Sequence, residues 1–169
     1  MMHTLYLISV WLHIMAAVVW ICGTIFLALV LIPAIRRPEF GSIALELIRW
    51  TVLRFRLVGW ICFAVFIVTG TMNLIFRGVT WSALFNADFW QGSFGTVLSL
   101  KLTLVAIIFV VSALHDFVIG PSATTAWQHN PSSKETARLR NQAVQIARVN
   151  LLLALIAVAL GTMLVRGSP

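Results

Sequence analysis

The sequence predicts an all-α integral membrane protein, a four-helix bundle with both chain ends on the non-cytoplasmic side. Of the 169 residues, 60% are hydrophobic and only 10% are charged, which leaves more apolar surface than a soluble domain of this length can bury. Four apolar runs are each long enough to cross the hydrocarbon core as a helix. The basic residues gather in two of the three connections, and this asymmetry predicts the orientation.

The four apolar runs define the predicted spans. A helix satisfies its own backbone inside a bilayer, and each run holds the roughly 20 apolar residues that a span needs. The predicted spans are 5–32, 55–76, 96–119 and 144–165, which together make one transmembrane domain over residues 1–169. No Lys or Arg precedes the first run, which is longer than the core of a secretion signal. We therefore expect a retained span rather than a cleaved leader.

The connections differ in charge. The first, residues 33–56, carries five arginines, the third carries several basic residues after Gly120, and the middle one, from Gly78 to Gly95, carries none. The positive-inside rule places the first and third connections in the cytoplasm. Residues 41–54 are predicted to form a helix that either lies at the interface or extends the second span. Residues 120–142, rich in Ser, Thr, Pro and charge, are predicted to begin as a solvated loop.

The net charge of +7 belongs to residues that flank the apolar runs. We read them as orientation signals, and expect the lipid bilayer rather than nucleic acid as the partner. The sequence has no Gly-rich phosphate loop, no Cys/His zinc spacing and no nucleophile constellation. We therefore expect a non-enzymatic role, and the enzymatic alternative is a haem-dependent membrane oxidoreductase.

Polar side chains inside the apolar runs are the candidate functional residues, because each is costly in hydrocarbon unless it is partnered or used. Their depths predict two layers. The outer layer contains His3, His13, Met72, Asn73, Lys101 and Met163, with Trp20 on the same helical stripe as His13. The inner layer contains Arg54, His115, Asp116, Arg148 and Asn150. Since Lys101 and His115 are about 21 Å apart along their helix, His13 and His115 are not expected to share one metal ion or haem.

Three roles remain open for these residues. Neutral imidazole binds copper and thioether sulfur favours Cu(I), so His13 with the methionines is a candidate copper site. His3, third in the chain, can join the terminal amine and two backbone nitrogens in a square-planar Cu(II) site. A b-type haem with His13 or His115 as axial ligand is the second cofactor considered. In the third reading the histidines are packing groups, Lys101 extends to water and Asp116 pairs with an arginine.

The chain resembles the CopD-like copper-resistance membrane proteins over most of its length, in the stretches WLHIMAAVVWICGTIFLALVLIPAIRR, RFRLVGWICFAVFIVTGTMNL, LKLTLVAIIFVVSALHD and ARVNLLLALIAVALGTMLVRG. The landmarks are His13, Trp20 and Gly23, then Arg54-Phe55 and Thr69-Gly70, then Lys101-Leu102. This resemblance implies residence in a bacterial inner membrane and a link to copper handling, with a periplasmic copper carrier or other membrane subunits as partners.

The same landmarks are more remotely similar to the HemJ-type protoporphyrinogen oxidases, which are small haem-linked membrane proteins. After Gly23, however, the chain lacks the aromatic-rich Pro-Arg stretch ending in histidine that marks that family. We therefore predict a copper-associated inner-membrane protein that binds or passes copper from the outer face, with His13 as the leading ligand. Lys101 would tune charge, since a protonated ammonium cannot coordinate a cation. The alternatives are a b-type haem protein for electron transfer or porphyrin oxidation, and a structural subunit of a membrane complex.

Overall fold

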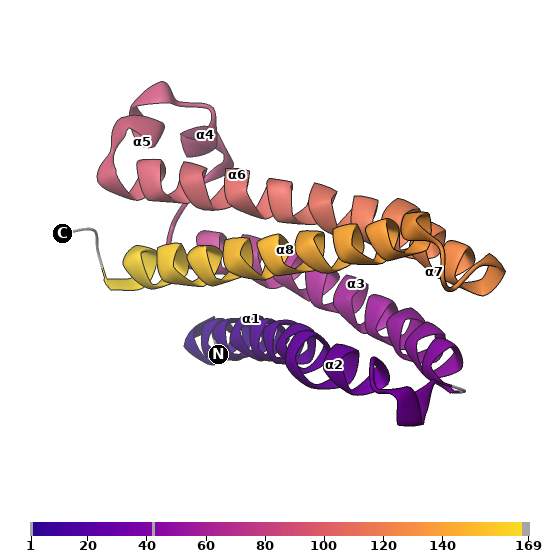
Figure 1. Cartoon of the computed structure of the whole chain (residues 1–169). Coiled ribbons are helices and arrows are strands. Elements are labelled where there is room, and N and C mark those ends of the chain that lie inside the picture. Colours follow the sequence, from indigo (N-terminus) through magenta and orange to yellow (C-terminus); the bar gives the residue numbers. More distant parts are fainter. Residues whose placement is uncertain (1, 42, 167–169) are drawn as a thin grey trace.

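The computed structural model describes residues 2–41 and 43–166, and within these ranges all regular structure is helical. Four helical stretches are long and apolar enough to cross a membrane: Met2–Ile35, Ala44–Phe76, Ser93–His129 and Lys134–Val165. The predicted all-α membrane bundle is therefore confirmed. Figure 1 shows the four stretches lying side by side.

Two of the four stretches change helical type along their length. The first consists of α1 (Met2–Phe26), the π-helical η1 (Leu27–Leu31) and α2 (Ile32–Ile35). The third consists of α6 (Ser93–Leu114), the π-helical η3 (His115–Ile119) and α7 (Gly120–His129). The second and fourth are the single helices α3 (Ala44–Phe76) and α8 (Lys134–Arg166). The short elements are η2 (Pro38–Phe40), α4 (Trp81–Leu84) and α5 (Ala87–Gln91).

Each π turn comes just before a proline. Pro33 follows η1 and Pro121 follows η3, both in the first turn of the next helix. Proline lacks an N–H and its ring clashes with the carbonyl four residues earlier, so a widened turn lets the chain continue without a break. A Cβ at Gly120 would lie 3.0 Å from the His115 carbonyl oxygen, so the second π turn favours glycine there.

The bundle is built from two antiparallel helix pairs, α1 with α3 and α6 with α8. In the first pair Tyr6 meets Phe76, His13 meets Thr69, Trp20 meets Phe63 and Gly23 meets Phe55. In the second pair Lys101 meets Gly161 and Ser112 meets Asn150. We call the contact between the pairs the aromatic seam: Trp60 and Phe63 pack against Phe109 of α6 and Phe117 of η3.

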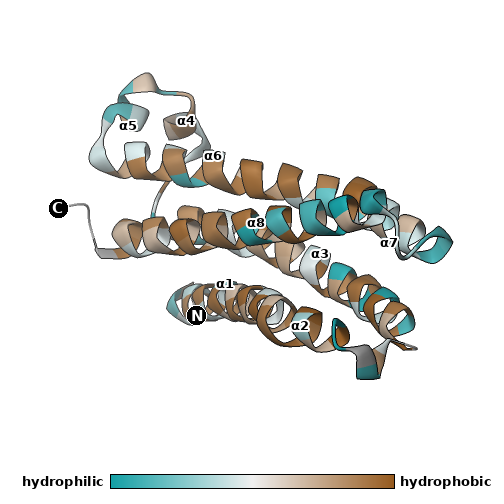
Figure 2. Cartoon of the chain, viewed as in Figure 1, coloured by the Kyte–Doolittle hydropathy of each residue, from teal (hydrophilic) through white to brown (hydrophobic). Residues whose placement is uncertain are grey.

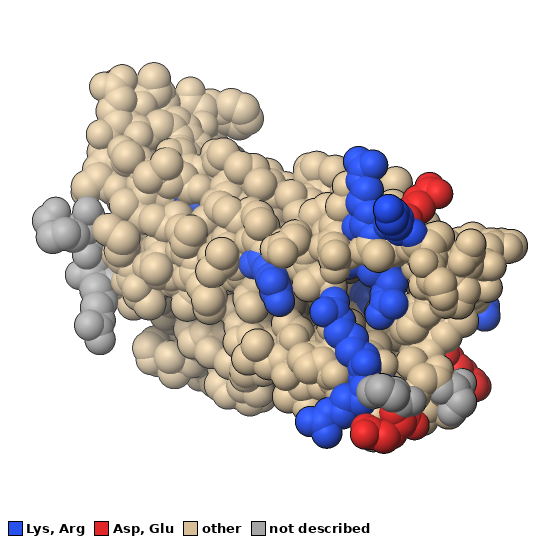
Figure 3. All heavy atoms as spheres, in the orientation of Figure 1, with Lys and Arg blue, Asp and Glu red and all other residues tan. Residues whose placement is uncertain are grey.

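The two ends of the bundle differ in character. The start of α1, the end of α8 and the α4–α5 segment lie at one end, the terminal end, and α2, α7 and the start of α8 lie at the other, the arginine end (Figure 1). Figure 2 shows hydrophobic colour along the middle of the helices and hydrophilic colour at α7 and the first turns of α8. The Lys and Arg side chains visible in Figure 3 gather mainly at the arginine end. The predicted cytoplasmic side corresponds to this end.

The solvated loop predicted after Gly120 is wrong. Helix α7 continues to His129, and only residues 130–133 separate it from α8. The Ser and Thr side chains do not break the helix, because Ser122 and Thr124 donate to the carbonyls four residues earlier. The buried Thr136 hydroxyl lies within hydrogen-bond distance of the Ala126 and Asn130 carbonyls and so ties the tight turn together. For residues 41–54, the structure favours the second of the two predicted forms, since α3 begins at Ala44 and extends the second span.

Candidate functional site

The polar side chains of the transmembrane region form two groups. The first lies toward the terminal end between α1 and α3, and comprises Ser9, His13, Thr69 and Asn73, with Lys101 of α6 nearby; we call it the His13 group. The second lies toward the arginine end, and comprises Arg56, Trp60, His115 and Asp116; we call it the Asp116 group. Each group draws side chains from at least two helices.

His13 is held against α3 by a short hydrogen bond. Its Nδ1 lies 2.7 Å from the Thr69 hydroxyl, and its ring packs edge-on against Phe66 with the ring centroids 5.2 Å apart. Gly70 lies beside the ring, and a Cβ there would make an ordinary contact of 3.7 Å with Cε1 of His13. The imidazole is therefore turned toward the neighbouring helix rather than toward lipid.

The hydrogen-bond network assigns the tautomer of His13. The Thr69 hydroxyl is 2.6 Å from the Val65 carbonyl, which can only accept a hydrogen bond. A hydroxyl has one proton, so Thr69 donates to Val65 and must accept from His13 Nδ1. With the proton on Nδ1, the neutral imidazole keeps its lone pair on Nε2, the atom available to a metal ion or a proton. Thr69 is 3% exposed, so water does not compete for this arrangement.

Asn73 lies one turn from Thr69, toward the terminal end of α3. Its side-chain oxygen is fully buried and has no hydrogen-bond partner among the described residues. A buried polar atom without a partner is costly. This oxygen is therefore an unused acceptor on the same helix face that positions His13.

Lys101 packs against Gly161 of α8. A Cβ at Gly161 would lie 3.2 Å from Lys101 Nζ. The ammonium is within electrostatic range of both His13 and Arg77. Arg77 itself donates a 2.6 Å hydrogen bond to the carbonyl of Leu164 near the end of α8. Positive charge is thus concentrated beside the His13 group.

No described hydrogen bond or ring contact joins the other predicted members of the outer layer to His13. His3 is exposed on α1, and Met1, whose amine the proposed terminal copper site needs, lies outside the described residues. Met163 is also exposed, and no described hydrogen bond or ring contact joins Met72 to His13. Trp20 packs on Phe63 and Gly59, two turns further along α1.

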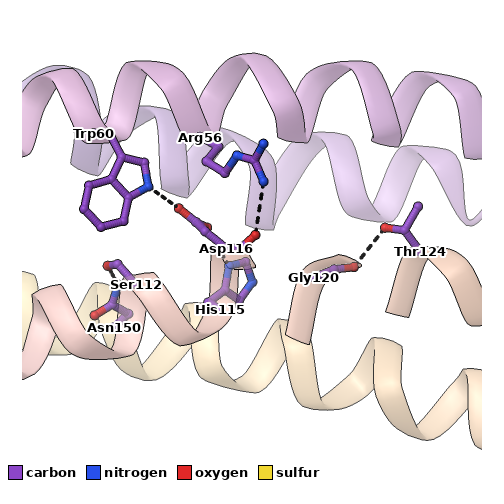
Figure 4. Close-up of polar contacts among 8 residues, drawn as sticks. All are labelled: Arg56, Trp60, Ser112, His115, Asp116, Gly120, Thr124 and Asn150. Atoms are coloured by element: carbon purple, nitrogen blue, oxygen red, sulfur yellow. Dashed lines mark hydrogen bonds and ion pairs between the residues drawn. The ribbon is translucent and has the colours of Figure 1, made fainter. Parts of the chain in front are cut away.

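The Asp116 group centres on one carboxylate (Figure 4). One oxygen of Asp116 lies 3.0 Å from His115 Nδ1 and the other accepts a 3.1 Å bond from Trp60 Nε1. Arg56 donates to the Asp116 backbone carbonyl at 3.3 Å, and its guanidinium stands over the Phe117 ring. An ionised carboxylate only accepts, so the proton of the neutral His115 imidazole lies on Nδ1 and its Nε2 is also unprotonated.

The remaining inner residues do not join Asp116. Asn150 donates a 2.7 Å bond to Ser112, which links α8 to α6, and its own side-chain oxygen has no partner among the described residues. Arg54 stacks over Trp50 and Arg148 is exposed. The arginine that reaches Asp116 is Arg56, through the backbone carbonyl.

The two histidines are too far apart to serve one centre. His13 contacts α3 at Thr69 and the Asp116 group contacts it at Trp60, and nine residues of helix correspond to about 13 Å. The axial positions of one haem iron cannot be filled by both. No three His, Cys, Asp or Glu side chains gather into a metal-binding cluster within the part of the chain that the structure describes.

Thr69, Trp60, Arg56 and Ser112 take part in these bonds and were not among the predicted site residues. Thr69 is a landmark of the family resemblance, and a threonine on the neighbouring span at the depth of a histidine is a usable signal. The contact between Trp60 and Asp116 joins residues 56 positions apart, and no local pattern indicates it.

Comparison with known proteins gives one match. A family model described as copper resistance protein D matches residues 49–164. This segment contains Thr69, Asn73, Lys101 and the whole Asp116 group, whereas His13 precedes it. No curated protein and no solved structure matches the chain.

Proposed function

Because the chain belongs to the copper resistance protein D family, we propose that it takes copper from the outer face of a bacterial inner membrane and passes it on, with His13 as an imidazole ligand. The terminal end is the outer face in this proposal, and a soluble copper carrier on that side would supply the ion. The observation that carries the proposal is the tautomer of His13, whose Nε2 is left free because Nδ1 donates to Thr69.

The small number of possible copper ligands near His13 favours transient binding during transport over stable storage of the ion. One imidazole does not hold copper tightly, and the described residues contain no cluster of three His, Cys, Asp or Glu side chains. The unpartnered Asn73 oxygen is available as a second donor on the same face of α3. An imidazole nitrogen with an amide oxygen suits Cu(II) better than Cu(I), which prefers sulfur.

Lys101 has the opposite effect on the ion. An ammonium cannot coordinate copper, and its charge repels a cation held at His13 across a low-dielectric region. In the proposed function this repulsion weakens retention and promotes release of the ion. A cargo site must give up its ion as well as capture it, so a nearby positive charge is compatible with transport.

The test is a copper count on the purified full-length protein in mild detergent, loaded with copper(II) chloride with and without ascorbate. We expect one copper per wild-type chain and an affinity reduced by more than about 100-fold in His13→Ala, because loss of a ligand exceeds the 10- to 100-fold effect of losing a supporting residue. The matched control is His129→Ala, which removes an exposed histidine of α7 at the arginine end. His3→Ala tests the terminal copper site, because only copper bound at that site should be lost in this variant.

Three results would contradict the proposal. Equal copper in the wild type and His13→Ala would remove the role of His13. A Soret band with stoichiometric iron would favour the haem protein, and the oxidised and reduced visible spectra of the same samples detect it. Neither metal in the wild type would favour the structural subunit.

A further inference from the structure

A pocket lined by arginines lies at the arginine end. It has a volume of about 410 Å³ and lies between the α2–α3 connection and the α7–α8 hairpin. Ile35 and Ala44, both buried, form its apolar floor. Arg36, Arg37 and Arg140 bring three guanidinium groups to its walls, and no carboxylate lines it.

These arginines repel one another. Arg36 and Arg140 come from different helix pairs and lie within electrostatic range of each other. Among the described side chains none of the three arginines forms an ion pair with a carboxylate. Like charges gathered without a counter-ion destabilise the pocket, and a bound anion removes that cost.

One of the three guanidinium groups is fixed in place. Arg140 stacks over the ring of Trp127, 3.9 Å from its centroid. Stacking holds the planar guanidinium in one orientation, so that two of its N–H groups can donate a bidentate pair of hydrogen bonds to one anion. Planar guanidinium groups match the oxygens of a phosphate, and Asn141 adds an uncharged polar side chain to the same wall.

We propose that this pocket binds a phosphate-bearing anion, and that the anion is the headgroup of an acidic phospholipid. The lipid source is favoured by the surroundings, since Ile43, just before α3, and Leu47 and Trp50, in its first two turns, are exposed apolar side chains. Acyl chains lie along such a surface while the headgroup enters the pocket. Basic pockets between helices at the cytoplasmic side bind lipid headgroups in this way. The proposal is independent of copper binding.

The experiment compares lipid retention by native mass spectrometry. Full-length protein is reconstituted in nanodiscs containing phosphatidylglycerol and phosphatidylcholine, and the lipids that remain bound are counted. We expect the wild type to retain one phosphatidylglycerol in preference to phosphatidylcholine. Arg36→Gln and Arg140→Gln should each lower this retention about tenfold, because each removes a charged hydrogen-bond donor. Arg49→Gln is the control, since it removes an exposed cation of α3 that does not line the pocket.

A second experiment distinguishes a lipid headgroup from a soluble phosphate as the bound anion. Inorganic phosphate is titrated into protein in phosphatidylcholine nanodiscs while the melting temperature is followed. A rise that depends on Arg36 and Arg140, without preference for phosphatidylglycerol, would keep the anion chemistry and assign it to a soluble ligand. Arg36 is exposed and has no described side-chain hydrogen bond, so Arg36→Gln should fold even if Arg140→Gln does not. Equal lipid retention in Arg36→Gln and Arg49→Gln, with no effect of phosphate, would overturn the proposal.

Discussion

Gly161 of α8 lies directly against the ammonium of Lys101, and a Cβ at this glycine would be 3.2 Å from Nζ. The contact places a positive charge inside the second helix pair at the level of a glycine. It also brings that charge within range of His13 in the first pair. The two pairs are therefore coupled by charge as well as by the aromatic seam.

Lys101→Leu should strengthen copper binding at His13. Leucine removes the charge without adding a copper ligand, as the thioether of methionine would, so a cation at His13 is no longer repelled. We expect an affinity increase on the order of tenfold, as for a pair of charges in a partly buried setting. Chelator competition on the purified protein measures it. Lys134→Leu, at the exposed start of α8, is the control, and weaker binding by Lys101→Leu would show that Lys101 supports the site instead.

Thr69→Val should lower copper affinity without unfolding the protein. Valine has nearly the same shape but cannot accept the hydrogen bond from His13 Nδ1, so the tautomer and ring orientation are no longer fixed. Loss of such a supporting partner costs about 10- to 100-fold in metal affinity. Thr69→Ser should retain most of the affinity. Thr71→Val is a matched control, because Thr71 makes the same bond to the carbonyl four residues earlier but on an exposed face.

Gly23→Ala should destabilise the first helix pair. The added methyl group would overlap the ring of Phe55, and overpacking of this kind costs about 1–3 kcal/mol. Gly59→Ala is the counterpart, because its Cβ would make an ordinary 3.5 Å contact with Trp20 and alanine is the better helix former by about 1 kcal/mol. Thermal unfolding in detergent should separate the two variants in opposite directions. Equal melting temperatures would argue against close packing at Gly23, and Phe55→Leu should partly rescue Gly23→Ala.

Labelling with a membrane-impermeant maleimide tests the orientation. In a background of Cys22→Ala and Cys62→Ala, Ser82→Cys in α4 should react in intact cells, because the terminal end is predicted to face outward. Ser132→Cys, between α7 and α8, should react only after the cells are permeabilised. Both serines are exposed, so access to solvent does not distinguish them. The reverse pattern would invert the predicted topology.

The fold could be predicted because its signal is local. Runs of apolar residues of the right length admit only helices in a bilayer, and the four spans follow. The helix ends could not be predicted, because Ser122 and Thr124 donate their hydroxyl protons to carbonyls four residues earlier and so fit into a helix, in a segment whose composition is typical of a loop. A π turn before Pro121 likewise allows the helix to pass a residue that usually stops one.

The candidate site was predicted in part. Depth along each helix selected His13, Asn73 and Lys101, but depth does not say which side of a helix faces a neighbour. Arg54 and Arg56 differ by about 200° around the helix, and Arg56 is the one that reaches Asp116. The partners of His13 and Asp116 belong to another helix, so their identity depends on helix pairing that a single sequence does not specify.

The pairing of the helices has a consequence for biogenesis. Every described hydrogen bond that Ser9 and His13 make through their side chains is completed within the first 76 residues, so these two side chains can gain their partners before α6 and α8 leave the ribosome. Trp60 and Arg56 gain their described partner only when η3 has been synthesised. A chain stopped after the second span should therefore insert with His13 already oriented, whereas Trp60 and Arg56 should still lack Asp116 as their hydrogen-bond partner.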